Sequence, residues 1–265
     1  MPPAMPSLFD LTGKVAIVTG STKGIGLAIA KRMAEHGATV VVSSRRRDAC
    51  EAVAKEIVDA GGKAVVIPCH VGRKEELQNL VDRTLAQCGG IDIVVSNAAV
   101  NPYLGPQAGA SDDVYERVMG TNVRSNFWLS NMTCPHIAAR GGGSYIIISS
   151  IGGVMGSASL GLYGISKAAD IAIIRNIAVE WGPKNIRANA IAPGLVRTDF
   201  ARALWEDPVR YKKTVRDAPL GRIGEPDEIA GAAVFLASPA GSFTTGHTLL
   251  IDGGRMAGSP LHNDD

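Results

Sequence analysis

The sequence predicts an α/β fold, a parallel sheet that is doubly wound with helices on both faces. Short apolar runs rich in β-branched residues recur along the chain, helical patterns separate them, and the runs are apolar at nearly every position. Strands covered by helices on both faces need such continuous apolar runs. Ligands are then expected beyond the carboxyl ends of the strands. The runs are Val15–Thr19, Thr39–Ser43, Ala64–Pro68, Ile91–Val95, Tyr145–Ser149, Arg187–Ile191 and Thr248–Ile251.

Length and composition favour one globular domain that spans residues 1–265. The chain is 46% hydrophobic, which is enough for one sizeable core. Its 27 basic and 25 acidic residues give a net charge of +2, without a long block of one sign. We therefore expect neither a nucleic acid nor a membrane as partner.

Cysteine usage and the chain ends indicate a reducing, cytoplasmic setting. The first ten residues lack the basic start and apolar stretch of a signal peptide, and no apolar run reaches 18 residues. The final segment, Leu261–Asp265, lacks a peroxisomal ending. The cysteines show no C-x-x-C spacing, so we expect no metal site and a structural role for Cys50, Cys69, Cys88 and Cys134.

The first apolar run leads into a glycine-rich turn, Thr19–Gly26, which a strongly helical segment follows. Glycine lets the backbone turn tightly and approach a pyrophosphate, while a helix N-terminus offers free N–H groups and a positive dipole end. The position between a strand and a helix makes this turn typical of a Rossmann-type dinucleotide site. The expected cofactor contacts in it are Gly20, Thr22, Lys23, Gly24, Ile25 and Gly26.

The end of the second apolar run indicates which dinucleotide is bound. A site for NAD usually places an acid there to hold the ribose hydroxyls, whereas Ser43–Arg47 contains none. The hydroxyl of Ser44 and the planar donors of Arg45 suit a 2′-phosphate, and a lysine in the glycine turn adds charge. We therefore expect NADP(H). Arg46 and Arg47 either join this site or are solvated charges on the next helix.

Tyr163 and Lys167 open an apolar helix that continues to about Trp181. A spacing of four places the phenol and the ammonium on one helix face, one turn apart. A free phenol has a pKa of about 10, so acid–base work near neutrality needs a cation that favours phenolate. Lys167 is placed to supply that cation. A Tyr-x-x-x-Lys match alone is common by chance, so the assignment depends on further motifs.

Several further motifs join this pair: the Thr19–Gly26 turn, Ser96-Asn97-Ala98-Ala99, Thr121-Asn122-Val123, Ser150, and Pro193-Gly194 with Thr198. With this set of motifs, the chain resembles the short-chain dehydrogenase/reductase family from Gly13 to Gly254, and its carbonyl-reductase branch in particular. The resemblance implies a seven-stranded parallel sheet, a catalytic set of Ser150, Tyr163, Lys167 and Asn122, and frequent tetramers.

The resemblance also implies a role for each catalytic residue. Tyr163 is the general acid in reduction and the base in oxidation, and Ser150 hydrogen-bonds the substrate oxygen. Lys167 also holds the nicotinamide ribose, and Asn122 positions a water that links Lys167 to solvent. Oriented donors stabilise the charge that hydride transfer builds on a carbonyl oxygen. Ser149 points to the opposite face of its strand, so its role is expected to be structural. Further expected cofactor contacts are His70, Val71, Asn97, Ala98, Pro193, Gly194, Val196 and Thr198.

Two residues depart from the family pattern in the cofactor pocket. Ala99 stands where the family often has glycine, which adds one methyl group near the adenosine side. His70 stands where the family commonly has an aspartate that accepts a hydrogen bond from the adenine amino group. A neutral histidine accepts at one ring nitrogen, with a different reach. Contact between His70 and adenine stays open.

The segment Pro193–Leu220 interrupts the α/β alternation with mixed polar, aromatic and proline content. Because it follows a strand at the ligand-binding edge, we expect a substrate lid at about 194–220. An ordinary surface connection with a short helix is the alternative.

The later part of the catalytic helix is apolar on more sides than one buried stripe requires, at Ile171, Ala172, Ile173, Ile174, Ile177, Ala178 and Val179. A homotetramer that uses the helices at about Ser111–His136 and Ser159–Trp181, and a second axis near the final strand, would cover the surplus. The alternative is that this surplus packs under the lid segment.

These observations predict an NADP(H)-dependent oxidoreductase that interconverts a ketone or aldehyde and an alcohol. A 3-oxoacyl thioester reductase shares every motif above and is the nearer alternative. A catalytically silent dinucleotide-binding sensor is the remote one, because such a protein would be expected to lose the tyrosine, the lysine or the serine.

Overall fold

Seven parallel strands form the central sheet of the computed structural model, which describes residues 7–258. Their order is β3-β2-β1-β4-β5-β6-β7, so the chain changes direction across the sheet between β1 and β4. This is the predicted Rossmann-type fold, and the prediction is confirmed. The strands are β1 (Val15–Thr19), β2 (Thr39–Ser43), β3 (Lys63–Val66), β4 (Ile93–Ser96), β5 (Gly143–Ile148), β6 (Ile186–Pro193) and β7 (Thr248–Ile251).

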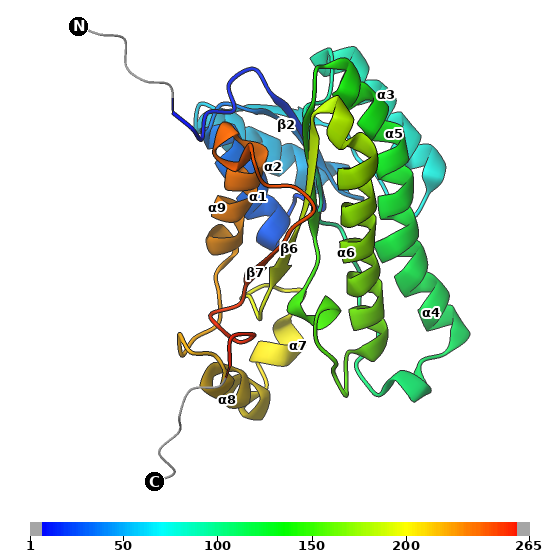
Figure 1. The fold of residues 1–265 in the computed structure, drawn as a ribbon, viewed down its shortest axis with the longest axis vertical. Coiled ribbons are helices and arrows are strands. Elements are labelled where there is room, and N and C mark those ends of the chain that lie inside the picture. Colours follow the sequence, from blue (N-terminus) through cyan, green and yellow to red (C-terminus); the bar gives the residue numbers. More distant parts are fainter. Residues whose placement is uncertain (1–6, 259–265) are drawn as a thin grey trace, which may run out of the picture.

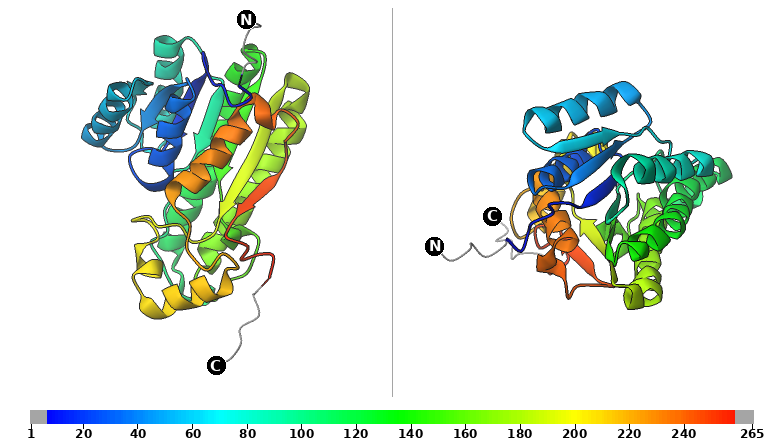
Figure 2. Two further views of the ribbon diagram at one scale, coloured as in Figure 1. Left: turned by 90° about the vertical axis from the view of Figure 1, so that its left-hand side faces the viewer. Right: turned by 90° about the horizontal axis from the view of Figure 1, so that it is seen from above.

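Helices cover both faces of this sheet (Figure 1, Figure 2). One face carries α1 (Gly24–Glu35), α2 (Arg47–Asp59) and α9 (Pro226–Ala237). The other carries α3 (Lys74–Cys88), α4 (Asp112–Met119), α5 (Ser125–Ala139) and α6 (Gly161–Trp181). The short helices α7 (Arg202–Trp205) and α8 (Pro208–Asp217) lie apart from these layers, at one end of the molecule (Figure 1).

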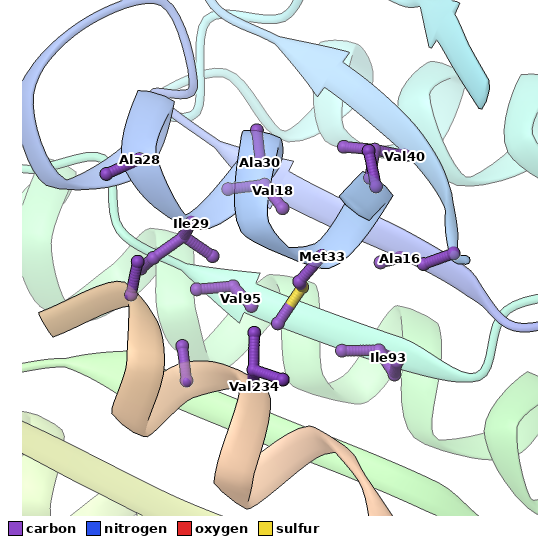
Figure 3. Close-up of a cluster of buried hydrophobic side chains, with 14 of the residues drawn as sticks. Ala16, Val18, Ala28, Ile29, Ala30, Met33, Val40, Ile93, Val95 and Val234 are labelled. Atoms are coloured by element: carbon purple, nitrogen blue, oxygen red, sulfur yellow. The ribbon is translucent and has the colours of Figure 1, made fainter. Parts of the chain in front are cut away.

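The strands are apolar at nearly every position because each face of the sheet packs against its own helix layer. In β1, Ala16 and Val18 belong to the cluster beneath α1 and α9, whereas Val15 and Ile17 belong to the opposite cluster. Figure 3 shows Met33 of α1 and other apolar side chains filling the space between these helices and the sheet. The sheet is therefore held rigidly, and the loops at its carboxyl edge start from fixed positions.

The bounds of β1, β2 and β7 are those predicted, while β3, β4, β5 and β6 differ from the predicted runs at their ends. The run Ala64–Pro68 overshoots β3, which ends at Val66, because Pro68 has no N–H to donate to a ladder. β4 starts at Ile93, and the Asp92 carboxylate before it accepts a 2.9 Å hydrogen bond from the Val15 N–H. Between α4 and α5 lies a π-helical segment, Gly120–Arg124, where the sequence predicted one regular helix.

Within residues 7–258, no helix is both long enough and apolar enough to cross a membrane. The same residues contain no cluster of three or more metal-ligating side chains. All four cysteines are free thiols, and only Cys88 is partly exposed. Burial raises the pKa of the Cys69 and Cys134 thiols to about 12, which fits their expected role as core residues. The expectations for Leu261–Asp265, and part of those for the first ten residues, lie outside the described residues.

Candidate active site

A cleft of 1250 Å³ opens at the carboxyl ends of the strands, next to the point where the strand order changes between β1 and β4. Its walls come from the loops after all seven strands. Every residue that the sequence predicted for the site lines this cleft except Gly26 and Asn122.

The glycine turn forms one end of the cleft and has the backbone geometry that glycine allows. Gly20 has a φ of 67° and Gly24 a φ of 57°, in the left-handed region. Gly26 has an ordinary φ, but a Cβ there would collide with the Gly20 carbonyl and the Asn97 amide. Gly26 therefore serves the close packing of the turn against the loop after β4, and it does not face the cleft.

The N-terminus of α1 points its unpaired N–H groups at this end of the cleft. The residue before the helix, Lys23, is extended and forms no side-chain cap, and the first turn contains no acid. An uncapped helix N-terminus favours an anion, both through its N–H groups and through its dipole. These residues fit the diphosphate of a dinucleotide.

Asn97 fixes the floor of the cleft by joining the ends of β4 and β1. Its side-chain Nδ2 donates to the Thr19 carbonyl at 2.9 Å, and the Thr19 hydroxyl accepts from the Asn97 N–H at 3.0 Å. The Ala98 N–H donates to the same hydroxyl at 3.1 Å. The amide of Asn97 is therefore engaged within the protein, and its role is to hold the turn in place.

The loop after β2 presents two polar side chains to the cleft, Ser44 and Arg45. Arg45 is exposed and forms no ion pair with any other described residue. Arg46 and Arg47 are paired with acids of α2, at 3.8 and 3.7 Å. Arg45 is thus the guanidinium of this run that is available to a phosphate. Arg47 does not line the cleft, and it agrees with the alternative of a solvated charge on the next helix.

His70 faces the cleft with one ring nitrogen already used. Its ring Nδ1 accepts a 3.1 Å hydrogen bond from the Gly72 N–H, and the backbone N–H of His70 donates to the Glu76 carboxylate at 2.7 Å. A neutral ring whose Nδ1 accepts carries its hydrogen on Nε2. The nitrogen that remains is a donor, so it cannot replace an aspartate as acceptor for an adenine amino group.

The structure brings Tyr163, Lys167 and Ser150 together where the loop after β5 meets the first turn of α6. The Lys167 ammonium lies 5.7 Å from the centroid of the Tyr163 ring. The Ser150 hydroxyl accepts from the Gly152 N–H at 3.0 Å, which fixes it beside the phenol. Ser149 is buried and donates to the Lys167 carbonyl at 2.8 Å, so it joins β5 to α6 as expected.

The pKa of Tyr163 lies above its usual range, in contrast to the expectation from the sequence. Burial is the largest cause of the rise, and the Asp170 carboxylate adds to it. The Lys167 ammonium and the Ser150 hydroxyl lower the pKa of Tyr163, as predicted for the lysine, but they do not outweigh burial. The phenol is accordingly a proton donor at neutral pH in the protein alone.

Asn122 lies behind the cleft, fully buried in the π-helical segment. Its Nδ2 donates to the Val100 carbonyl and to the Ser166 hydroxyl, both at 3.0 Å, and its Oδ1 accepts from the Val100 N–H at 2.8 Å. Both amide hydrogens are therefore used within the protein. The side chain holds the loop after β4 against α6 and forms no hydrogen bond with Lys167 among the described residues.

Sequence reasoning missed the acid that contacts the lysine. Lys167 donates to the Asp170 carboxylate and to the Ile148 carbonyl, both at 2.9 Å. The other carboxylate oxygen of Asp170 accepts from the Asn126 side-chain Nδ2 at 2.6 Å, and the side-chain Oδ1 of Asn126 accepts from the Ser96 hydroxyl. The visible signal was an acid in an apolar stretch three residues after a lysine, a spacing that places both on one helix face.

The segment Pro193–Leu220 reaches back to Tyr163 and to the glycine turn. The ring of Phe200 lies 6.1 Å from the ring of Tyr163. Thr198 approaches the glycine turn, where its methyl carbon would be 3.2 Å from a Cβ built on Gly24. Trp205 of α7 donates to the Thr198 carbonyl at 2.9 Å. The segment therefore borders both ends of the cleft.

The chain is similar to a known protein family and to several individual proteins. The profile of the family described as "Enoyl-(Acyl carrier protein) reductase" matches residues 20–255. "Dehydrogenase/reductase SDR family member 4" from Bos taurus is 41% identical over 247 residues, which are 93% of this chain and 88% of that protein.

Two similar solved structures contain different nicotinamide cofactors. A gluconate 5-dehydrogenase from Burkholderia cenocepacia, in complex with NADP and tartrate, has a TM-score of 0.91 and 32% identity, covering 94% of this chain and 98% of the other. A 7α-hydroxysteroid dehydrogenase, complexed with NADH and 7-oxo glycochenodeoxycholic acid, has a TM-score of 0.90 and 36% identity, covering 98% and 100%.

Proposed function

Because this chain belongs to the short-chain dehydrogenase/reductase family of oxidoreductases, we propose that it interconverts a ketone or aldehyde and an alcohol with NADP(H). The observation that carries the proposal is the meeting of Tyr163, Lys167 and Ser150 in a cleft that also contains an uncapped helix N-terminus and an unpaired arginine. Reduction of a carbonyl by a dinucleotide needs an anion site that holds the cofactor and a proton donor for the substrate oxygen, and this cleft has both.

The cofactor would lie along the cleft from the loop after β2 to the catalytic residues. When bound, the nicotinamide supplies or accepts the hydride. The backbone of Gly20 and Thr22–Ile25 would hold the diphosphate, and Ser44 with Arg45 would hold the 2′-phosphate. Similar proteins bind NADP in one case and NADH in another, so the preference for NADP(H) is supported by Arg45.

In the direction of reduction, Ser150 would donate a hydrogen bond to the carbonyl oxygen, and Tyr163 would transfer its proton to that oxygen as negative charge develops there. The raised pKa of Tyr163 keeps the phenol protonated for this step. Lys167 would stabilise the phenolate that remains. In oxidation Tyr163 must first lose its proton, so alkaline pH would favour that direction.

We propose that the segment at about 194–220 is a lid over the substrate end of the cleft. Its Phe200 packs beside Tyr163, and it contributes further lining residues from α7 and α8. Closure of such a segment would exclude water from the developing charge. The whole chain would act as one domain, and its cytoplasmic location stays a prediction from the sequence.

A substrate panel tests the proposal. Purified protein is supplied with ketones and aldehydes, with 3-oxoacyl and enoyl acyl-carrier thioesters, and with alcohols for the reverse reaction. Each is run with both NADPH and NADH, or with their oxidised forms. We expect turnover of free carbonyl compounds, with NADPH preferred.

The panel also distinguishes the alternatives. Turnover of acyl-carrier thioesters alone would favour the thioester reductase, an alternative that the description of the matching family keeps open. Tight NADPH binding without any turnover would favour a silent dinucleotide sensor and would overturn the proposed function.

A further inference from the structure

Lys167 is one of very few cations in the described part of the chain that is removed from water. Its side chain is 3% exposed, and that of Asp170 is fully buried. The ammonium and the carboxylate are 2.9 Å apart, on consecutive turns of α6. An isolated ammonium in such surroundings loses its proton readily, because burial disfavours the charged form.

The carboxylate is itself held in a fixed orientation by other elements. Asn126 of α5 donates to one oxygen of Asp170, and Lys167 donates to the other. Asn126 is in turn fixed by the Ser96 hydroxyl at the end of β4. Burial raises the pKa of Asp170, and the charge of Lys167 with the hydrogen bonds from Lys167 and Asn126 opposes that rise and favours the carboxylate. This chain of contacts connects the catalytic lysine to the sheet through three elements.

The hydrogen bonds of Lys167 within the described residues leave one of its N–H groups without a partner. An ammonium has three N–H donors, and Asp170 and the Ile148 carbonyl take two of them. Lys167 also lines the cleft. The third N–H is therefore the one available to the contents of the cleft.

Few of the described titratable groups lie close enough to Lys167 to change its pKa. Among residues 7–258, those that influence Lys167 are Asp170 and Tyr163. The phenol of Tyr145, on β5, faces Asp170 from the sheet and lies 3.5 Å from the Asn126 carbonyl. The pKa of Tyr145 lies well above its usual range because it is buried, so it stays neutral. Asp170 is thus the negative charge that balances Lys167.

We propose that Asp170 is a positioning residue of the active site, which keeps Lys167 protonated and directs its free N–H into the cleft. Burial lowers the pKa of Lys167 and Asp170 raises it, with a net rise. Asp170 also raises the pKa of Tyr163. The pair Tyr163–Lys167 therefore retains both protons to higher pH than it would without the carboxylate, which favours reduction. This inference rests on the proposed function only for its kinetic test.

The sign of the pH effect follows from charge alone. Reduction needs the pair with both protons, so activity falls as pH rises through the pH at which the first proton leaves. Removing a negative charge nearby makes that first loss easier, whether the proton comes from the lysine or from the tyrosine. Asp170→Asn removes the charge and keeps the size of the side chain. We expect the alkaline limb of the pH profile of kcat for reduction to move down by about 1–3 pH units.

Two variants separate charge from structure. Asp170→Glu keeps the charge but displaces it, so we expect kcat to fall while the alkaline limb stays near its wild-type position. Ser96→Ala removes a hydrogen bond to Asn126, which in turn contacts Asp170. This variant should lower the melting temperature without moving the alkaline limb. If Asp170→Asn does not fold, Asp170→Ser, which leaves room for water beside Lys167, takes its place. Folding is checked by circular dichroism and cooperative melting.

A titration without substrate or cofactor keeps this inference separate from the proposed function. Wild-type protein and Asp170→Asn, both without cofactor, are compared by acid–base difference titration. We expect Asp170→Asn to release one proton at a lower pH than the wild type. An unchanged alkaline limb, an equal shift in Asp170→Glu, or identical proton release would each overturn the role of Asp170. A wild-type protein without carbonyl turnover would overturn the proposed function alone.

Discussion

In the proposed mechanism, the phenol proton of Tyr163 is the one transferred to the substrate oxygen. Tyr163→Phe removes this proton and leaves the ring and its contact with Phe200 in place. We expect carbonyl reduction to fall by about 10²–10⁴-fold, the usual contribution of general acid catalysis. The NADPH dissociation constant, from fluorescence titration, should be nearly unchanged. Lys167→Ala should weaken both turnover and binding, and a Tyr163→Phe enzyme with more than about a tenth of wild-type turnover would contradict the role of the phenol.

The unpaired guanidinium of Arg45 is the basis of the expected preference for NADPH. Loss of a charge-assisted hydrogen bond to the 2′-phosphate costs about 1.5–3 kcal/mol, or roughly 10–100-fold in catalytic efficiency. The double variant Ser44→Asp with Arg45→Gln should therefore prefer NADH, because the new carboxylate repels the phosphate and accepts from ribose hydroxyls. The measurement is kcat/KM with each cofactor.

Arg47→Gln is the matched control for this change. Arg47 is paired with an acid of α2 and does not line the cleft, so its loss should leave the ratio of the two efficiencies unchanged. A wild-type enzyme that uses NADH as efficiently as NADPH would show that Arg45 does not select the cofactor.

At this scale the sequence could predict contacts within one segment better than contacts between segments. The Tyr163 and Lys167 pair lies on one helix face, so its spacing alone indicates that the two meet. Asp170 was missed although its contact with Lys167 also lies within α6. The other contacts of Asp170, and those of Asn122 with Val100, join separate elements. Those contacts require the sheet order, which residue spacing does not contain. The direction of the Tyr163 pKa could not be predicted either, because burial depends on the complete fold.

Among the elements, the segment with α7 and α8 differs from the rest because it packs over the cleft instead of against the sheet. Phe200 is 53% exposed and touches Tyr163, so its side chain can contribute to substrate binding with little role in stability. Phe200→Ala should raise KM for the carbonyl substrate about 2–10-fold, from the loss of an aromatic contact worth about 0.5–1.5 kcal/mol. The melting temperature should stay unchanged.

Val209→Ala is the control for the lid. Val209 is 78% exposed on α8 and does not line the cleft, so KM should not respond to its truncation. If Phe200→Ala also leaves KM unchanged, the segment is the ordinary surface connection that the sequence left as an alternative.

Strand positions were predictable because turn residues mark the ends of buried runs, as at β1, β2 and β7. The π-helical segment at Gly120–Arg124 was not, since its extra residue is stabilised by tertiary contacts. Asn122 within it reaches both Val100 and Ser166. A helical pattern in the sequence predicts that a helix is present, but it does not show where a turn widens to serve a site.

At the scale of the whole molecule, some apolar side chains of α6 are buried against the sheet and others remain exposed. The surplus predicted for α6 is partly satisfied within one chain, since Ile171, Ile174 and Ile177 are buried in the core cluster on that face of the sheet. These side chains pack on the sheet and not beneath the proposed lid, which removes the stated alternative for them. Val179 remains 81% exposed near the end of the helix.

Two separate surfaces of the chain keep large apolar side chains in contact with solvent. Phe127 on α5 is 56% exposed, on the helix layer that was predicted to form the main contact. Phe243 just before β7 is fully exposed, and Leu250 on that edge strand is 41% exposed. We predict that these two places are the two kinds of contact in the expected homotetramer, because contact with another subunit would remove each aromatic side chain from water.

Charged substitutions on these surfaces test the assembly one axis at a time. Phe127→Glu should separate the tetramer into dimers, and so should Phe243→Glu, because a buried unpaired carboxylate is strongly unfavourable at either interface. The double variant should be a monomer. Val58→Glu, at a 53% exposed position of α2 outside both surfaces, should remain a tetramer. Light scattering of dilute protein gives each mass directly. A wild-type protein that is a stable, active monomer would mean that these apolar side chains face solvent without a partner, and that the active site needs no second subunit to hold its helices in place.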